Sequence, residues 1–87
     1  MTYQVLLTRQ AEKSFRTLTK ADQSRIRTAL AAMQHELLAG DVIKLSGHDA
    51  YRRRVGTHRV LFTVVEADIV ILVLAISRRN ERTYKKL

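Results

Sequence analysis

Closely spaced arginines in the second half of the chain are the residues whose type and spacing could do chemistry. A guanidinium group presents several N–H donors in one plane and fits the oxygens of a phosphate group. A tyrosine nearby can stack on a nucleobase or hydrogen-bond a hydroxyl group. The set consists of Arg52, Arg53, Arg54, Arg59, Arg78, Arg79 and Tyr84. These residue types favour contacts with the backbone of single-stranded RNA.

Strand alternation decides which of these arginines share a face. Residues 51–55 are expected to form a strand, so Arg52 and Arg54 project together, about 6.6 Å apart at roughly 3.3 Å per residue. Arg53 points to the other side of the sheet. Arg59 begins the next antiparallel strand, and the last strand is expected to bring the arginines that follow it to the same rim.

Other kinds of catalytic or ligand-binding site find little support. The chain has no cysteine, which removes thiolate metal ligands and a thiol nucleophile. Residues 46–49 contain serine, histidine and aspartate side by side, but a catalytic triad converges from distant segments and the nucleophile-elbow motif is missing. The three histidines lack the spacing of metal ligands, and three glycines cannot build a phosphate-binding loop. The sequence therefore predicts no metal site and no cofactor.

The charge of the chain is positive and uneven. Its 87 residues, expected to form one domain over 1–87, carry 16 Lys and Arg against 8 Asp and Glu, a net charge of +8. Residues 44–87 hold ten cations and four anions, and therefore +6 of that charge. The charge indicates a polyanionic partner, nucleic acid before acidic protein or a membrane surface. The longest apolar run is eight residues, too short to cross a bilayer, and with no signal sequence at the N-terminus a cytoplasmic location is expected.

Two helices are expected in the first half of the chain. Thr8 is suited to cap a helix over residues 9–18, whose apolar positions recur at i, i+4 and i+7. Thr19 is suited to cap a second helix over residues 20–39, with Gly40 ending it. A joint this short predicts an antiparallel helical hairpin.

Strands are expected on both sides of this hairpin. Residues 3–7 predict a short N-terminal strand, and residues 51–55, 58–65 and 69–76 predict an antiparallel meander joined by tight turns. Because every residue of 69–76 is apolar, this strand is expected in the interior, covered on both faces. The fold class is therefore α+β, with the helices on one face of the sheet and residues 77–87 as a short C-terminal helix or tail.

Three segments carry a family resemblance along nearly the whole chain. They are Lys44-Leu45-x-Gly47, Tyr51-Arg52-Arg53-Arg54-Val55-Gly56-x-x-Arg59-Val60-Leu61-Phe62 and Ser77-Arg78-Arg79-x-Glu81-x-x-Tyr84. With them the chain resembles the RelE/ParE superfamily of bacterial toxins from type II toxin–antitoxin systems. The spacing from Arg78 to Tyr84 is more typical of the RelE branch, whose members cleave messenger RNA in the ribosomal A site.

The resemblance implies a role for each matching residue. Arg59 would hold the scissile phosphate, Arg78 would stabilise charge or protonate the leaving oxygen, and Tyr84 would orient the substrate, which makes these three the catalytic set. The remaining matches imply RNA-binding residues, which are Arg52, Arg54, Arg79 and Lys85. Cleavage in this family needs no metal, because the 2′-hydroxyl of the RNA attacks the adjacent phosphate.

The strand pair departs from the best-known RelE pattern, which has lysines there. Arginine effectively cannot give up its proton, so Arg52 and Arg54 can bind and neutralise charge but cannot act as a general base. His58 is the nearest side chain suited to proton transfer near neutral pH. Strand alternation places His58 and Arg59 on opposite faces, which counts against this role.

The function expected from the resemblance is that of an endoribonuclease toxin. It implies three partners: a cognate acidic antitoxin in a hetero-oligomer, messenger RNA and the ribosome; no membrane partner is expected. A ParE-like inhibitor of DNA gyrase, which is not an enzyme, would use the same fold. A homologue that has lost catalysis and only binds is the third interpretation, which the arginine-for-lysine change supports.

Overall fold

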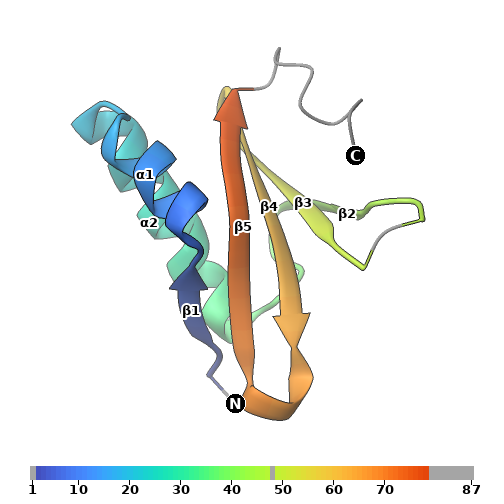
Figure 1. Cartoon of the computed structure of the whole chain (residues 1–87). Coiled ribbons are helices and arrows are strands. Elements are labelled where there is room, and N and C mark those ends of the chain that lie inside the picture. The colour runs from blue at the N-terminus through green and yellow to red at the C-terminus, as the bar shows by residue number, and fades with distance from the viewer. Residues whose placement is uncertain (1, 48, 79–87) are drawn as a thin grey trace.

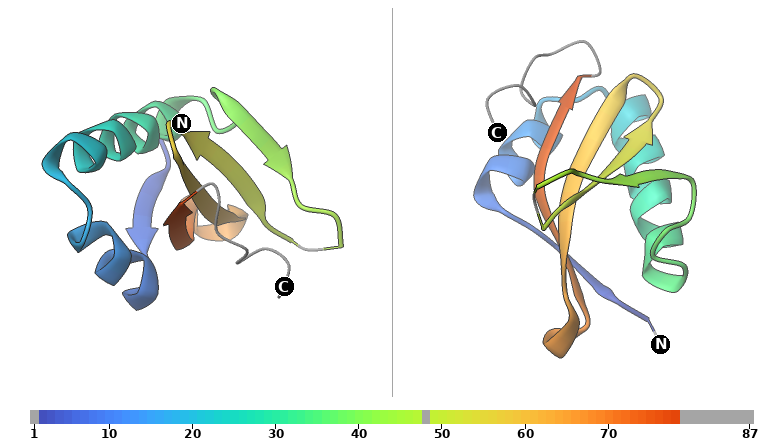
Figure 2. Two further views of the ribbon diagram at one scale, coloured as in Figure 1. Left: turned by 90° about the horizontal axis from the view of Figure 1, so that it is seen from above. Right: turned by 90° about the vertical axis from the view of Figure 1, so that its right-hand side faces the viewer.

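The computed structural model describes residues 2–47 and 49–78. Two helices, α1 (Arg9–Arg16) and α2 (Lys20–His35), lie against one face of a five-stranded sheet (Figures 1 and 2). The strands are β1 (Gln4–Leu7), β2 (Asp41–Lys44), β3 (Tyr51–Val55), β4 (His58–Val65) and β5 (Val70–Arg78), with a 3-10 turn, η1 (Glu66–Asp68), between the last two. This α+β arrangement confirms the predicted fold class.

Both predicted helix caps are present. The side chain of Thr8 accepts a hydrogen bond from the backbone N–H of Ala11, and Thr19 accepts one from Asp22. These bonds satisfy N–H groups that have no partner inside the helix. Figure 1 shows the two helices running in opposite directions, as the short joint predicts.

The second helix is shorter than the predicted range. It ends at His35, where Glu36 takes an extended conformation, and the backbone N–H of Ala39 bonds back to Glu36 in a turn. Gly40 follows this turn with φ +82° and leads directly into β2. Gly40 therefore does not cap the helix; it supplies the left-handed conformation that redirects the chain into a strand.

The sheet contains the predicted meander and two further pairings. The strand order is β1-β5-β4-β3-β2, in which β1 runs parallel to β5 and the other neighbours are antiparallel. Strand β2 was not predicted, and it extends the expected three antiparallel strands to four. Strand β5 lies in the interior between β1 and β4, as predicted.

The core lies between the helices and the sheet. It consists of Ala11, Ile26, Leu30, Met33, Val60, Phe62, Ile71, Val73 and Ile76. On β5 the side chains facing the helices are buried, whereas Leu72 and Ala75 on the other face are only half-buried. The expected cover on both faces is therefore complete on the helix face and only partial on the other, because the helices pack on one face only.

A bulge in β5 places Val73 and Ile76, which are three positions apart, on the same face of the strand and in this core. Phe62 pairs with Val73 and Leu61 pairs with Ala75, which leaves Leu74 as the extra residue. The carbonyl of Leu74 accepts a hydrogen bond of 2.9 Å from the Thr8 hydroxyl, so the helix cap also ties down the bulge. The bulge reverses the alternation of side chains along the rest of β5.

A substitution at Gly40 tests whether Arg53 holds the turn that leads into β2. A Cβ atom at this position would overlap the guanidinium of Arg53, in addition to the strain of its positive φ. Gly47 has φ +75° and open space around it, so Gly47→Ala meets the backbone strain alone, about 1–2 kcal/mol. The guanidinium ends a flexible side chain and can swing aside, giving up its hydrogen bond to the Arg54 carbonyl, so we expect Gly40→Ala to lower the melting temperature slightly more than Gly47→Ala in circular dichroism. Equal melting temperatures would show that Arg53 does not hold this turn.

Candidate nucleic-acid interface

The pairing of four strands places polar side chains in one row on the face away from the helices. Arg54 lies directly opposite Arg59 on β4 and opposite Asp41 on β2, and Arg59 lies opposite Ser77 on β5. Directly opposite residues in a sheet share a face. Arg54 and Arg59 are like charges at neighbouring positions, an arrangement that costs stability. A cost of this kind favours a role in binding an anion.

Arg52 lies on the same face, two residues along β3. Its cross-strand neighbours, Ile43 and Leu61, are apolar, and the residue is only 8% exposed. Burial of a charged group is unfavourable unless an opposite charge compensates it. Asp41 supplies that charge, with 3.3 Å between its Oδ1 atom and Nη2 of Arg52.

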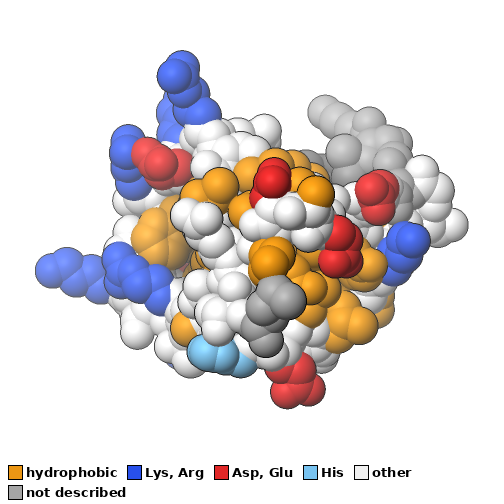
Figure 3. Space-filling view, turned by 90° about the horizontal axis from the view of Figure 1, so that it is seen from below, with side chains coloured by type: hydrophobic (Ala, Val, Ile, Leu, Met, Phe, Trp, Pro, Cys, Tyr) orange, Lys and Arg blue, Asp and Glu red, His pale blue; other side chains and the backbone are white. Residues whose placement is uncertain are grey.

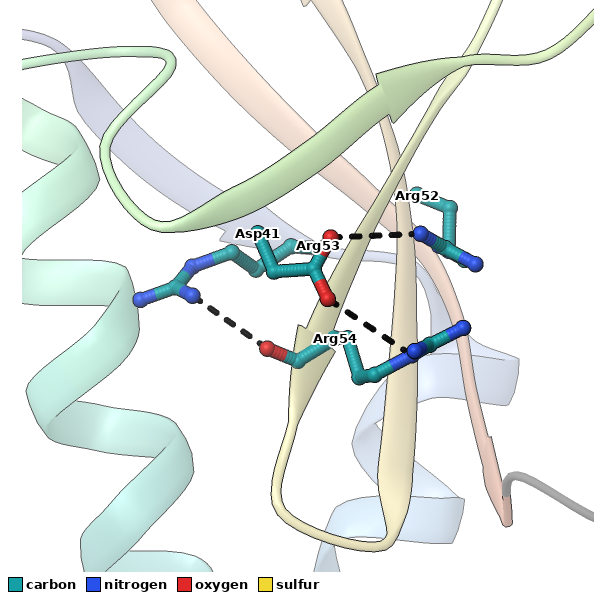
Figure 4. Close-up of polar contacts among 4 residues, drawn as sticks. All are labelled: Asp41, Arg52, Arg53 and Arg54. Carbon is teal, nitrogen blue, oxygen red and sulfur yellow. Dashed lines mark hydrogen bonds and ion pairs between the residues drawn. The ribbon is translucent and has the colours of Figure 1, made fainter.

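Asp41 contacts Arg54 as well. Its second oxygen, Oδ2, lies 3.7 Å from Nε of Arg54, so that one carboxylate bridges two guanidinium groups (Figure 4). Sequence reasoning missed Asp41 because it missed β2. The signal available was the pair of β-branched residues, Val42 and Ile43, that follows Gly40 closely.

Arg53 lies on the opposite face, as strand alternation predicts. Its Nη1 donates a hydrogen bond of 3.2 Å to the backbone carbonyl of Arg54. Its side chain lines a surface groove of about 390 Å³ together with α2 residues such as Arg25 and Ala29. Arg53 is therefore separated from Arg52 and Arg54 by the sheet itself.

Arg78 reaches the predicted rim on the other face. It pairs with His58 at the end of the sheet, one position beyond the pair formed by Arg59 and Ser77. Both Arg78 and His58 line a cavity of about 240 Å³ beside the end of α1. Arg78 thus lies at the rim next to the pair formed by Arg59 and Ser77 but on the opposite face from Arg59, because the bulge at Leu74 reverses the alternation of β5.

His58 is buried on the helix side of the sheet. It is 4% exposed, and its Nδ1 lies 3.4 Å from the hydroxyl of Thr57. The predicted separation of His58 and Arg59 onto opposite faces is confirmed. This position removes His58 from the face that carries Arg52, Arg54 and Arg59.

Three of the predicted site residues, Arg79, Tyr84 and Lys85, lie outside the described residues. Within residues 2–47 and 49–78, no group of three or more His, Cys, Asp or Glu could hold a metal ion. No helix in the same part of the chain is long and apolar enough to cross a membrane.

Solved structures share this fold over nearly the whole chain. The archaeal RelE–RelB complex from Pyrococcus horikoshii OT3 contains a chain 34% identical to this one, with a TM-score of 0.82, covering 93% of this chain and 99% of the other. The chain belongs to the RelE/ParE superfamily. Neither a protein-family model nor a curated protein matches the sequence.

More distant members of the superfamily share the architecture. The E. coli RelBE toxin–antitoxin complex matches with a TM-score of 0.77 and 19% identity, covering 91% of this chain and 99% of the other. The YoeB/ParE toxin from Agrobacterium tumefaciens matches with a TM-score of 0.76 and 17% identity, covering 86% and 96%. At these identities the likeness concerns the fold alone.

Proposed function

We propose that this RelE/ParE member is a toxin that cleaves messenger RNA, in the ribosomal A site and thus in the cytoplasm. The observation that carries the proposal is the placement of Arg52, Arg54 and Arg59 on one face of the sheet, across β3 and β4. Guanidinium groups grouped in this way suit the oxygens of a phosphate. The match of Arg78 and Tyr84 to the RelE pattern supports the same reaction.

In the proposed reaction the RNA supplies its own nucleophile. The 2′-hydroxyl oxygen attacks the adjacent phosphorus, the bond to the 5′-oxygen breaks, and the products are a 2′,3′-cyclic phosphate and a 5′-hydroxyl. Negative charge builds on the phosphate oxygens in the transition state, where Arg59 would stabilise it, with Arg52 and Arg54 as RNA-binding neighbours. The 2′-hydroxyl gives up its proton to water and the leaving oxygen takes one up from water, while Arg78 would stabilise the charge that develops on that oxygen and Tyr84 would orient the substrate. Arg79 and Lys85 complete the proposed RNA contacts.

Two substitutions test this function. We expect Arg78→Ala and Tyr84→Phe each to lower messenger cleavage by about tenfold or more, because each removes a group that contacts the reacting atoms. Expression of each variant should relieve the growth arrest that the parent causes. Cleavage sites on a translated messenger, mapped with and without ribosomes, measure both the loss and the ribosome requirement. Both variants cleaving and arresting growth like the parent would contradict the assignment.

An acidic antitoxin is the proposed partner in a hetero-oligomer. The Pyrococcus horikoshii structure is a RelE–RelB complex, and the present chain carries a net charge of +8. A partner with negative charge would mask the face of Arg54 and Arg59 and so block RNA. An adjacent reading frame encoding a small acidic helical protein would support this pairing.

Inhibition of DNA gyrase is the second candidate function. The likeness in fold to the YoeB/ParE toxin favours it. In this case added protein would stop gyrase supercoiling in vitro and leave messenger RNA intact. Intact supercoiling together with cleaved messenger would exclude it.

A further inference from the structure

Asp41 is an acidic side chain that contacts two arginines of the proposed RNA-binding face, Arg52 and Arg54. It lies on the edge strand β2, half-exposed, and its two oxygens reach two different guanidinium groups. The distances are 3.3 Å to Nη2 of Arg52 and 3.7 Å to Nε of Arg54. A negative charge inside a face meant for phosphate lowers the affinity of that face for RNA. Its presence there needs a reason other than RNA binding.

The two guanidinium groups provide that reason. Arg52 and Arg54 carry like charges on one face of one strand, and Arg52 is buried, so their mutual repulsion is only weakly screened. A carboxylate between them offsets the repulsion and fixes both groups relative to each other. Figure 4 shows Nη2 of Arg52 and Nε of Arg54 turned toward Asp41, and a terminal nitrogen of each guanidinium group directed away from it, toward the same side. These nitrogens are the donors that a phosphate would meet.

We propose that Asp41 is a positioning residue for RNA cleavage, an inference that rests on the proposed function. It holds the Arg52 and Arg54 guanidinium groups as one preorganised phosphate-binding unit. The carboxylate weakens RNA binding and raises the rate of cleavage of bound RNA. These two effects have opposite signs, which separates positioning from a merely structural role.

Asp41→Asn tests the two effects separately. Binding to a 2′-O-methyl oligonucleotide, which cannot be cleaved, should be as tight or tighter, with a salt slope steeper by about 0.7 for the one charge no longer neutralised internally. The plateau rate of messenger cleavage at saturating protein should fall by roughly 10- to 100-fold, because the donors are no longer held in place. Asp41→Glu, which retains the charge, should recover much of the plateau rate.

Asp68→Asn is the matched control. It removes the same charge by the same chemical change, in the turn η1 at the far end of β4 and β5. Figure 3 looks at the molecule from that end, where acidic and apolar side chains occupy the middle and Lys and Arg lie at the margins. The Asp68→Asn plateau rate should equal that of the parent. An Asp41→Asn plateau rate equal to that of Asp68→Asn would overturn the proposal.

A second pair of variants tests the proposal even if Asp41→Asn fails to fold. Removing the partner of a buried charge is destabilising, whereas removing both members of the pair is far better tolerated. The double variant Asp41→Asn with Arg52→Gln should therefore fold. At saturation it should cleave messenger more slowly than Arg52→Gln alone, since Arg54 is then released. Equal rates would overturn the inference. A parent protein that cleaves no messenger would instead contradict the proposed function itself.

Discussion

Replacing Arg59 by alanine is expected to lower the rate of messenger cleavage by about 100- to 1,000-fold, the effect of removing one preorganised donor from a developing negative charge. Arg59 lies directly opposite Arg54 and one strand from Ser77. The neighbouring guanidinium cannot replace it, because Asp41 holds that group through its Nε atom. The rate is measured on a translated messenger in a reconstituted translation mixture.

Two variants make this result specific. Lys13→Ala removes one positive charge from the exposed surface of α1, away from the proposed site, and should leave the rate close to that of the parent. Arg59→Lys keeps the charge but loses the planar fork, so its rate should lie between those of the parent and Arg59→Ala. The melting temperature of Arg59→Ala should stay within about 4–8 °C of the parent, equivalent to roughly 1 kcal/mol. A parent-like rate for Arg59→Ala would remove this residue from the proposed reaction.

The arrangement of Arg54 and Arg59 could be predicted because short-range features determine it. The tight turn at Gly56, which has φ +58°, joins β3 directly to β4 and pairs Val55 with His58. That pairing in turn places Arg54 opposite Arg59. Strand alternation then separates His58 from Arg59. No long-range information is needed for any of these steps.

The position of Arg78 could not be predicted in this way. Without the bulge, the side chains of Val73 and Arg78 would point to opposite faces of the sheet, and Arg78 would share the face of Arg59. The extra residue Leu74 shifts the alternation by one position and so turns Arg78 to the helix face. The hydrogen bond that holds Leu74 comes from Thr8, 66 residues away in sequence. A contact between segments so far apart leaves no periodic signal near Leu74.

Strand β2 was missed for a related reason. It has four residues, two of them charged, and it gains its place in the sheet only by pairing with β3. Such a segment has little strand preference of its own. Because the prediction lacked this strand, it did not include Asp41 among the site residues. It also lacked the carboxylate that allows Arg52 to be buried.

Phe62→Ala is expected to produce the largest loss of stability. Phe62 is fully buried on the helix face of β4, and its ring stacks on Tyr51 with 5.3 Å between the ring centroids. Deleting a buried phenylalanine side chain costs about 3–5 kcal/mol. A domain of this size has a total stability of roughly 4–13 kcal/mol, so the variant should be close to unfolding at physiological temperature. Thermal and urea denaturation followed by circular dichroism measure the loss.

Phe62→Ala and Arg59→Ala should both lose cleavage, but the temperature dependence of the loss should differ between them. Tyr51 and Phe62 are cross-strand partners, and Arg52 and Leu61 form the next pair on the opposite face, so loss of the Phe62 ring should loosen the arginines as well. We therefore expect Phe62→Ala to lose cleavage and stability together, and to regain cleavage on cooling. Leu38→Ala is the control, since Leu38 is 60% exposed and its truncation should leave both properties unchanged. If Phe62→Ala melted like Leu38→Ala, the ring would not be part of the core that supports β3 and β4. Arg59→Ala, in contrast, should lose cleavage at every temperature while the fold is retained, because its effect lies in the transition state and not in the packing.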